Sequence, residues 1–128
     1  MELREYAPIV TRIGLSAVFL WFGISQLADP GYFLGYVPDA LAAQGETLLL
    51  ANGIFETVFG SLLLLGLFTR IAALLLGLHL LGIAGGLGYN DIAVRDIGLT
   101  LAAFSVALFG ADRWTLDYHR KNHRGASP

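Results

Sequence analysis

The stretch LLLANGIFETVFGSLLLLGLF, residues 48–68, decides the fold class of this chain. It has the length and composition of a helix that crosses a lipid bilayer, since roughly 20 apolar residues span a hydrocarbon core about 30 Å thick. The stretch nevertheless contains an acid, Glu56, and an amide, Asn52. An ionisable group inside a span costs free energy, so we looked in the rest of the chain for a partner or a purpose for Glu56.

The composition of the whole chain also indicates a membrane protein. Hydrophobic residues make up 55% of its 128 residues and charged residues 14%, whereas soluble domains carry about 25% charge. The mean hydropathy is +0.64. A net charge of −2 gives no overall basic surface for nucleic acid. The chain has no cysteine, so a redox role needs a bound cofactor or a partner subunit.

Four apolar runs are long enough to be spans, and they cover about residues 9–28, 48–68, 71–87 and 92–111. Each should be a helix, because backbone polar groups in lipid must be satisfied within their own segment. We therefore predict an all-α integral membrane four-helix bundle. Little more than Thr69 joins the second run to the third, which makes those two helices antiparallel neighbours.

The positions of the basic residues predict the orientation of the bundle. Lys and Arg flank the N-terminus, the turn between the second and third runs, and the C-terminus, whereas the other two connections are mainly acidic. The positive-inside rule then places both termini in the cytoplasm, in agreement with an even number of spans. We predict one membrane domain over residues 1–118 and a basic cytoplasmic tail over residues 119–128.

The connection DPGYFLGYVPDALAAQGE, residues 29–46, is the only long one. Its aromatic residues Tyr32, Phe33 and Tyr36 are typical of a segment in the outer membrane interface, with a short helix from Pro38 to Ala43.

Glu56 and His79 are expected to lie close together. At 1.5 Å per residue, Glu56 lies about 12 Å below the outer edge of the membrane and His79 about 12 Å above the inner edge, on neighbouring helices. Their heights then differ by about 5 Å in a core of about 30 Å, so a Glu56–His79 hydrogen bond is predicted. Asn52 shares the helix face of Glu56, four residues away.

Arg95 is the candidate counter-ion of Glu56, because an arginine side chain can extend about one further turn into the membrane. Asp91, one turn earlier, competes for it. Gln26 and Asp96 lie at similar heights and complete a predicted polar pocket in the outer half of the bundle. Arg12 lies near the inner edge and is expected to extend to the cytoplasmic headgroups.

Two interpretations of this cluster remain open. It is either a functional pocket, for a quinone, a small polar substrate or a proton relay, or a set of interhelical bonds that only holds the helices together. Glu56 and His79 alone are too few ligands for a metal, and His119 and His123 also lack a third ligand nearby. Small residues four positions apart, such as Gly82 and Gly86 or Gly98 and Ala102, permit close helix packing and self-association.

Three segments resemble motifs of the DoxX family of small four-helix membrane proteins. These are RIGLSAVFLWFGISQL (12–27), FETVFGSLLLLGLFTRIAAL (55–74) and GADRWTLD (110–117). The residues that match the family pattern are Arg12, Gly23, Glu56, Gly60, Gly66, Thr69, Arg70, Arg113, Leu116 and Asp117. Two positions depart from it, because Gln26 stands where the family often has lysine and Asp112 replaces a glycine.

The resemblance implies a multi-pass protein of a prokaryotic cytoplasmic membrane. Relatives are linked to membrane oxidoreductase assemblies, including the small subunit of thiosulfate:quinone oxidoreductase, and to oxidative-stress complexes. It therefore implies a subunit of a quinone-linked oxidoreductase that works with a soluble or membrane redox partner. Glu56 and His79 would transfer protons, and Asn52, Arg95, Gln26 and Asp96 would contact the ligand. The alternative is a non-catalytic scaffold or permeation protein, since a shared fold does not fix function.

Overall fold

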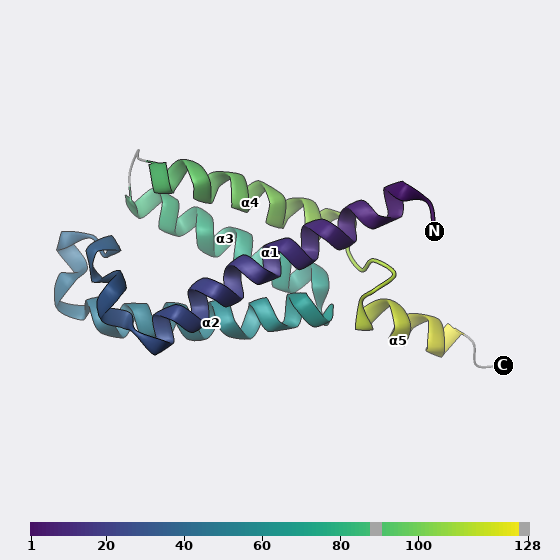
Figure 1. The fold of residues 1–128 in the computed structure, drawn as a ribbon, viewed down its shortest axis with the longest axis horizontal. Coiled ribbons are helices and arrows are strands. Elements are labelled where there is room, and N and C mark those ends of the chain that lie inside the picture. Colours follow the sequence, from purple (N-terminus) through teal and green to yellow (C-terminus); the bar gives the residue numbers. More distant parts are fainter. Residues whose placement is uncertain (88–90, 126–128) are drawn as a thin grey trace.

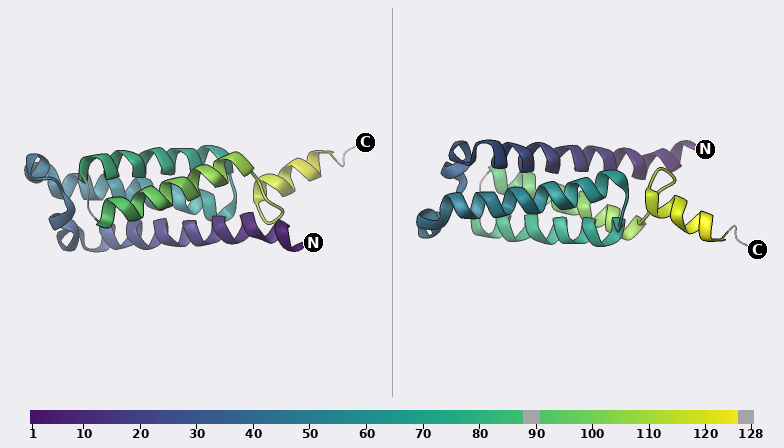
Figure 2. Two further views of the ribbon diagram at one scale, coloured as in Figure 1. Left: turned by 90° about the horizontal axis from the view of Figure 1, so that it is seen from above. Right: turned by 90° about the horizontal axis from the view of Figure 1, so that it is seen from below.

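The computed structural model describes residues 1–87 and 91–125, and within these residues the chain is helical and contains no strand. Four long helices form a bundle (Figure 1), namely α1 (Leu3–Ala28), α2 (Gly45–Leu65), α3 (Thr69–Leu87) and α4 (Asp91–Phe109). Two 3₁₀ helices, η1 (Pro30–Tyr36) and η2 (Asp39–Gln44), connect α1 to α2, and α5 (Leu116–Gly125) follows α4. Figure 2 shows the N-terminus and α5 at one end of the bundle and the 3₁₀ helices at the other.

The apolar helices are compatible with a membrane bundle, as predicted. Over the described residues, Leu3–Ala28, Asp39–Leu65 and Asp91–Phe109 have the length and hydropathy of membrane spans. α3 contains the further apolar segment Thr69–Ile83. The prediction of an all-helical membrane protein is confirmed at this level, and the cytoplasmic location of the termini stays a prediction.

α1 begins at Leu3, before the span predicted over residues 9–28, and α2 begins at Gly45, before the span predicted over residues 48–68. The short helix expected from Pro38 to Ala43 is the 3₁₀ helix η2. The side chain of Tyr36 lies outside what the structure describes. α5 begins at Leu116 and continues across the predicted boundary between the membrane domain and the tail, and residues 126–128 of that tail lie outside the described residues.

The helices pack as two close pairs, α1 with α2 and α3 with α4. Glycines permit the first contact, because a Cβ added at Gly23 would lie 2.9 Å from the backbone nitrogen of Thr57, and one at Gly53 would lie 3.0 Å from the carbonyl oxygen of Gly23. Gly77 has the same role between α3 and α4, where it faces Phe104. α2 and α3 are neighbours, as expected from their short connection, but they contact each other less extensively than the close pairs do.

The small residues that we predicted to bring the helices together do not all do so. A Cβ at Gly82 or Gly98 would meet no atom within 4 Å, so these two glycines do not mediate a contact within the chain. Gly86 lies among the positions whose side-chain surroundings are not described.

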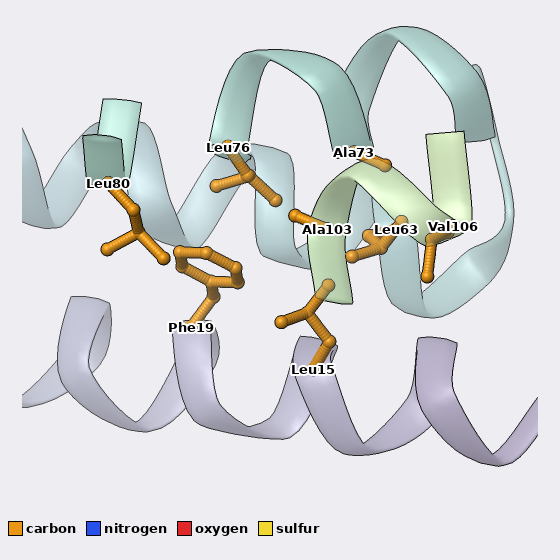
Figure 3. Packing of buried hydrophobic residues seen from close by; sticks show 8 residues of the cluster. All are labelled: Leu15, Phe19, Leu63, Ala73, Leu76, Leu80, Ala103 and Val106. Atoms are coloured by element: carbon orange, nitrogen blue, oxygen red, sulfur yellow. The ribbon is translucent and has the colours of Figure 1, made fainter. Parts of the chain in front are cut away.

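A buried apolar cluster joins the two helix pairs in the middle of the bundle (Figure 3). Phe19 on α1 and Leu76 on α3 are almost fully buried, at 2% and 0% exposure. The cluster consists of Leu15, Phe19, Leu63, Ala73, Leu76, Leu80, Ala103 and Val106. It lies between two groups of buried polar residues, one toward the termini and one toward the 3₁₀ helices.

Candidate functional site

A cavity of about 750 Å³ lies in the half of the bundle nearer the 3₁₀ helices. All four bundle helices line it, together with Phe33 of η1, Leu41 of η2 and the segment between these two. Most of its lining side chains are apolar. The polar ones are the six predicted site residues, Gln26, Asn52, Glu56, His79, Arg95 and Asp96. The structure therefore brings these six residues, from four different helices, to one cavity.

Asn52 is at the centre of the hydrogen bonds in this cavity. Its amide nitrogen Nδ2 donates to Oε1 of Gln26 on α1 at 2.6 Å, and its Oδ1 is hydrogen-bonded to Nε2 of His79 on α3. Because Oδ1 can only accept, this arrangement places a proton on Nε2 of His79. Asn52 thus connects α1, α2 and α3 across the cavity.

Glu56 is buried, with 4% of its surface exposed. Its Oε1 lies 3.9 Å from Nε2 of His79, which is an ion-pair distance and too long for a hydrogen bond. The predicted Glu56–His79 hydrogen bond is therefore wrong in detail, because Asn52 takes the hydrogen-bonding position at Nε2. The other oxygen of Glu56, Oε2, is buried and has no hydrogen-bond partner among the described residues.

Arg95 lies at the edge of the cavity with about half of its side chain exposed. Its Nη2 is 3.2 Å from Oδ1 of Asp96, and its guanidinium carbon lies 5.2 Å from the centre of the Phe22 ring on α1. Arg95 therefore forms its ion pair with Asp96. The pair predicted with Glu56 and the competing pair predicted with Asp91 are both wrong for this reason. Asp96 is adjacent in sequence and is itself only 4% exposed, so Arg95 offsets the cost of burying that carboxylate.

The rings of Phe55 and His79, both in the cavity lining, lie against each other, which the sequence analysis did not anticipate. The ring of Phe55 lies 4.4 Å from that of His79 and 4.6 Å from that of Phe59. Phe55 and Phe59 are four residues apart on α2, a spacing that could have indicated that their rings lie side by side. The ring of Phe55 thus covers one side of the His79 ring, next to Glu56.

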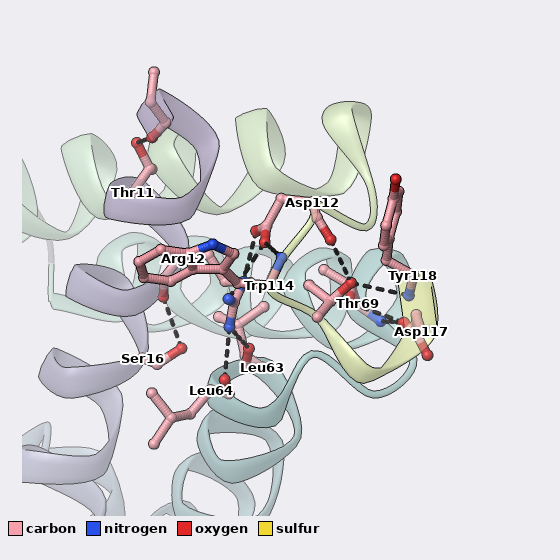
Figure 4. Close-up of polar contacts among 12 residues, drawn as sticks. Thr11, Arg12, Ser16, Leu63, Leu64, Thr69, Asp112, Trp114, Asp117 and Tyr118 are labelled. Carbon is pink, nitrogen blue, oxygen red and sulfur yellow. Dashed lines mark hydrogen bonds and ion pairs between the residues drawn. The ribbon is translucent and has the colours of Figure 1, made fainter. Parts of the chain in front are cut away.

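At the opposite end of the bundle, Arg12 is buried, and the prediction that it extends to the headgroups is wrong. Its Nε lies 2.7 Å from Oδ2 of Asp112, and its Nη1 donates to the carbonyl oxygens of Leu63 and Leu64 (Figure 4). Only 1% of Arg12 is exposed. Asp112 comes 100 residues later in the chain, so sequence spacing gave no sign of this pair.

The residues after α4 fix the turn between α2 and α3 (Figure 4). The carboxylate of Asp117 accepts hydrogen bonds from the backbone N–H groups of Phe68 and Thr69 and from the Thr69 hydroxyl. The backbone N–H of Asp117 donates to the carbonyl oxygen of Gly66. Burial opposes ionisation of Asp117, but these hydrogen bonds and nearby Arg120 lower its pKa below the ordinary value.

These contacts bring together two motifs that are far apart in the sequence. Thr69 and Asp117 belong to different motifs in the sequence but form one structural unit at the start of α3. This unit and the Arg12–Asp112 pair support the bundle at the end remote from the cavity. They therefore contribute to the fold and do not contact the candidate site.

The DoxX family pattern matches residues 7–88, which is more than half of the chain. The match includes α1, α2, α3 and the cavity residues Gln26, Asn52, Glu56 and His79. No curated protein and no solved structure matches the chain. On the evidence of the family match, this chain belongs to the DoxX family, and its apolar helices make it a multi-pass membrane protein.

Proposed function

We propose that this protein is a membrane subunit of a quinone-linked oxidoreductase assembly and that the cavity around Glu56 holds the quinone ring. The observation that carries the proposal is the Oε2 atom of Glu56, a residue of the cavity lining, because this atom is buried and has no hydrogen-bond partner among the described residues. A buried polar atom without a hydrogen bond costs about 1–3 kcal/mol, so a ligand that satisfies it stabilises the site.

The side chains fit the chemistry of a quinone. Its carbonyl oxygens accept hydrogen bonds, and a protonated Glu56 carboxyl group can donate one from Oε2. The rest of the ring needs an apolar surface, which Phe55, Phe22 and Leu49 offer from the cavity wall. The volume of about 750 Å³ is within the usual range for small-molecule sites, about 300–1,000 Å³.

A bound quinone supplies two-electron, two-proton chemistry, and the chain supplies the groups that handle protons. In this proposal Glu56 carries a proton on Oε2, the atom without a partner among the described residues. Nε2 of His79 lies 3.9 Å from Oε1 of Glu56. His79 could return a proton to Glu56 if the Nε2–H group turned from Asn52 to Oε1 while Nδ1 took up a proton in exchange. Asn52 orients the imidazole ring through its hydrogen bond to Nε2. In this proposal the electrons come from a partner subunit, and the chain itself has no cysteine to ligate an iron–sulfur centre.

A structural role for the cluster is the second candidate, and one observation favours it. Asn52 connects three helices through Gln26 and His79. Interhelical hydrogen bonds of this kind contribute about 0.6 kcal/mol each on average in membranes. This candidate makes the protein a scaffold or permeation protein without a redox ligand.

The variant Glu56→Gln separates the two functions, since it keeps the size of the side chain but removes its charge. We expect its thermal unfolding in detergent to match the natural protein, while reduction of decylubiquinone by membranes that contain the assembly falls by about 100-fold, the typical contribution of a proton-transfer group. Glu46→Gln is the control, because Glu46 is an exposed acid on the same helix. A variant that keeps both properties would exclude the proton role, and one that loses only stability would establish the structural role.

A further inference from the structure

On the wall of the cavity formed by α2 and α3, the exposed lining residues are all apolar, whereas the exposed lining residues elsewhere are Pro38, Leu41 and the charged Arg95. Leu48 of α2 and Leu78 of α3 are 40% and 50% exposed. Ala51 and Gly82, one turn further along each helix, are exposed as well and line the same cavity. All four are apolar. An opening of the cavity between α2 and α3 would therefore be apolar and would face lipid.

The arrangement of the helices accounts for this opening. α2 and α3 are joined by the short turn at residues 66–68, and α3 diverges from α2 with distance from that turn (Figure 1). Close packing pairs α1 with α2 and α3 with α4, which leaves less contact on both other sides of the bundle, between α2 and α3 and between α1 and α4. A Cβ at Gly82 would meet no atom within 4 Å, so no side chain fills the gap at that position.

The opposite side of the cavity is closed by contacts between α1, α4 and η1. The guanidinium group of Arg95 on α4 lies over the ring of Phe22 on α1, 5.2 Å from its centre. The Phe22 ring in turn contacts the edge of the Phe33 ring, with the two ring centres 6.5 Å apart. Phe33 is only 9% exposed. Entry on this side would require these contacts to break.

From this geometry we infer that the cavity is filled from within the bilayer, through the opening between α2 and α3 lined by Leu48, Ala51, Leu78 and Gly82. Its ligand is a membrane-dissolved amphiphile, whose small hydrogen-bonding head lies beside Glu56 and whose apolar tail remains in the opening, in contact with lipid. This inference rests on the proposed function, in which the cavity holds the quinone ring. It adds the route by which the ligand enters and the requirement that the ligand carry an apolar tail. Glu56 is buried, and the exposed lining residues on α2 and α3 are apolar, which is the order of groups in such a molecule.

The test uses a benzoquinone with a ten-carbon tail that carries a photoreactive diazirine at the tail end. The protein is reconstituted in lipid nanodiscs, illuminated, digested and mapped by mass spectrometry, with and without excess unlabelled decylubiquinone. We expect competable adducts within residues 48–51 and 78–82. Competable adducts on Phe22, Ile92 or Arg95 instead would overturn the route, while leaving the proposed quinone site in place.

Two glycine variants add a matched comparison. Gly82 and Gly98 are both exposed and both have room for a side chain, but only Gly82 lines the cavity. We expect Gly82→Leu to weaken binding of the tailed quinone roughly tenfold, a loss of about 1.4 kcal/mol, and Gly98→Leu to leave it unchanged. Equal binding by both variants would contradict the opening. If neither the tailed quinone nor the tail-free ring is retained by the unaltered protein, the proposed function itself is wrong.

Discussion

Arg12 illustrates how a charge can be kept inside an apolar bundle. Its guanidinium group is almost completely enclosed but bonds to Asp112 and to the carbonyl oxygens of Leu63 and Leu64. These carbonyls belong to the last turn of α2, which lacks helical partners for its final C=O groups. One side chain therefore satisfies a buried carboxylate and a helix end, and it joins α1, α2 and the segment after α4.

Removing Arg12 should be strongly destabilising, because it leaves Asp112 as a buried charge without a partner. We expect Arg12→Met to lower the free energy of unfolding by about 3–5 kcal/mol, measured by denaturant titration in detergent. Arg113→Met is the control, since Arg113 forms a half-exposed ion pair with Glu5 that is expected to contribute at most about 1 kcal/mol. Similar losses for both variants would show that burial of Arg12 is unimportant.

The contact between α1 and α2 depends on glycines at defined positions. A Cβ at Gly23 would lie 2.6 Å from the hydroxyl oxygen of Thr57, closer than atoms normally approach. Gly14 is on the same helix, but a Cβ there would meet nothing within 4 Å. The two glycines differ only in what faces them, which allows packing to be separated from helix propensity.

Gly23→Ala should therefore be destabilising and Gly14→Ala should not. Overpacking at Gly23 is expected to cost about 1–3 kcal/mol, whereas alanine in place of Gly14 should add about 0.5–1 kcal/mol through its better helix propensity. Thermal unfolding of the two purified variants, followed by circular dichroism, checks the pair. Equal shifts in the same direction would mean that the close approach of α1 and α2 is not a constraint.

The start of α3 should depend on pH through Asp117. Its pKa is lowered in the folded chain, so its contribution to stability is fully present above the unfolded value of about 3.9 and is lost as the pH falls through the lower folded value. We expect Asp117→Asn to be less stable than the natural protein at neutral pH and the difference to shrink below about pH 4. A difference that stays constant down to pH 2 would exclude the charge of Asp117 as its cause.

The elements could be predicted from the sequence more completely than their contacts. Hydropathy and length located the helices, and depth in the membrane placed Gln26, Arg95 and Asp96 at similar heights, which are properties of single segments. The partner of Arg12 could not be found in this way, because helix rotation and the 100-residue separation from Asp112 are settled only by packing. The same limit explains why Gly77, and not Gly82, turned out to face α4.

At the level of the whole molecule, the two ends of the bundle have different properties. The end with the termini is held by buried ionic and hydrogen-bonded contacts among Arg12, Asp112, Thr69 and Asp117. The end with the 3₁₀ helices contains the cavity and a carboxylate oxygen that lacks a partner among the described residues. A ligand site needs a rigid scaffold that holds it in place. Here one end of the bundle provides that support, and the other end leaves a polar atom for a ligand.

The most direct test of the central claim is organic extraction of the protein, purified from native membranes, with quantification of quinone and phospholipid by mass spectrometry. If the cavity holds a quinone, the extract should contain nearly one quinone per chain, well above the quinone-to-phospholipid ratio of the membranes. Asn52→Leu should lower this amount to that ratio, because it removes the hydrogen bonds to Gln26 and His79. A natural protein whose quinone content only follows its phospholipid content would contradict the account.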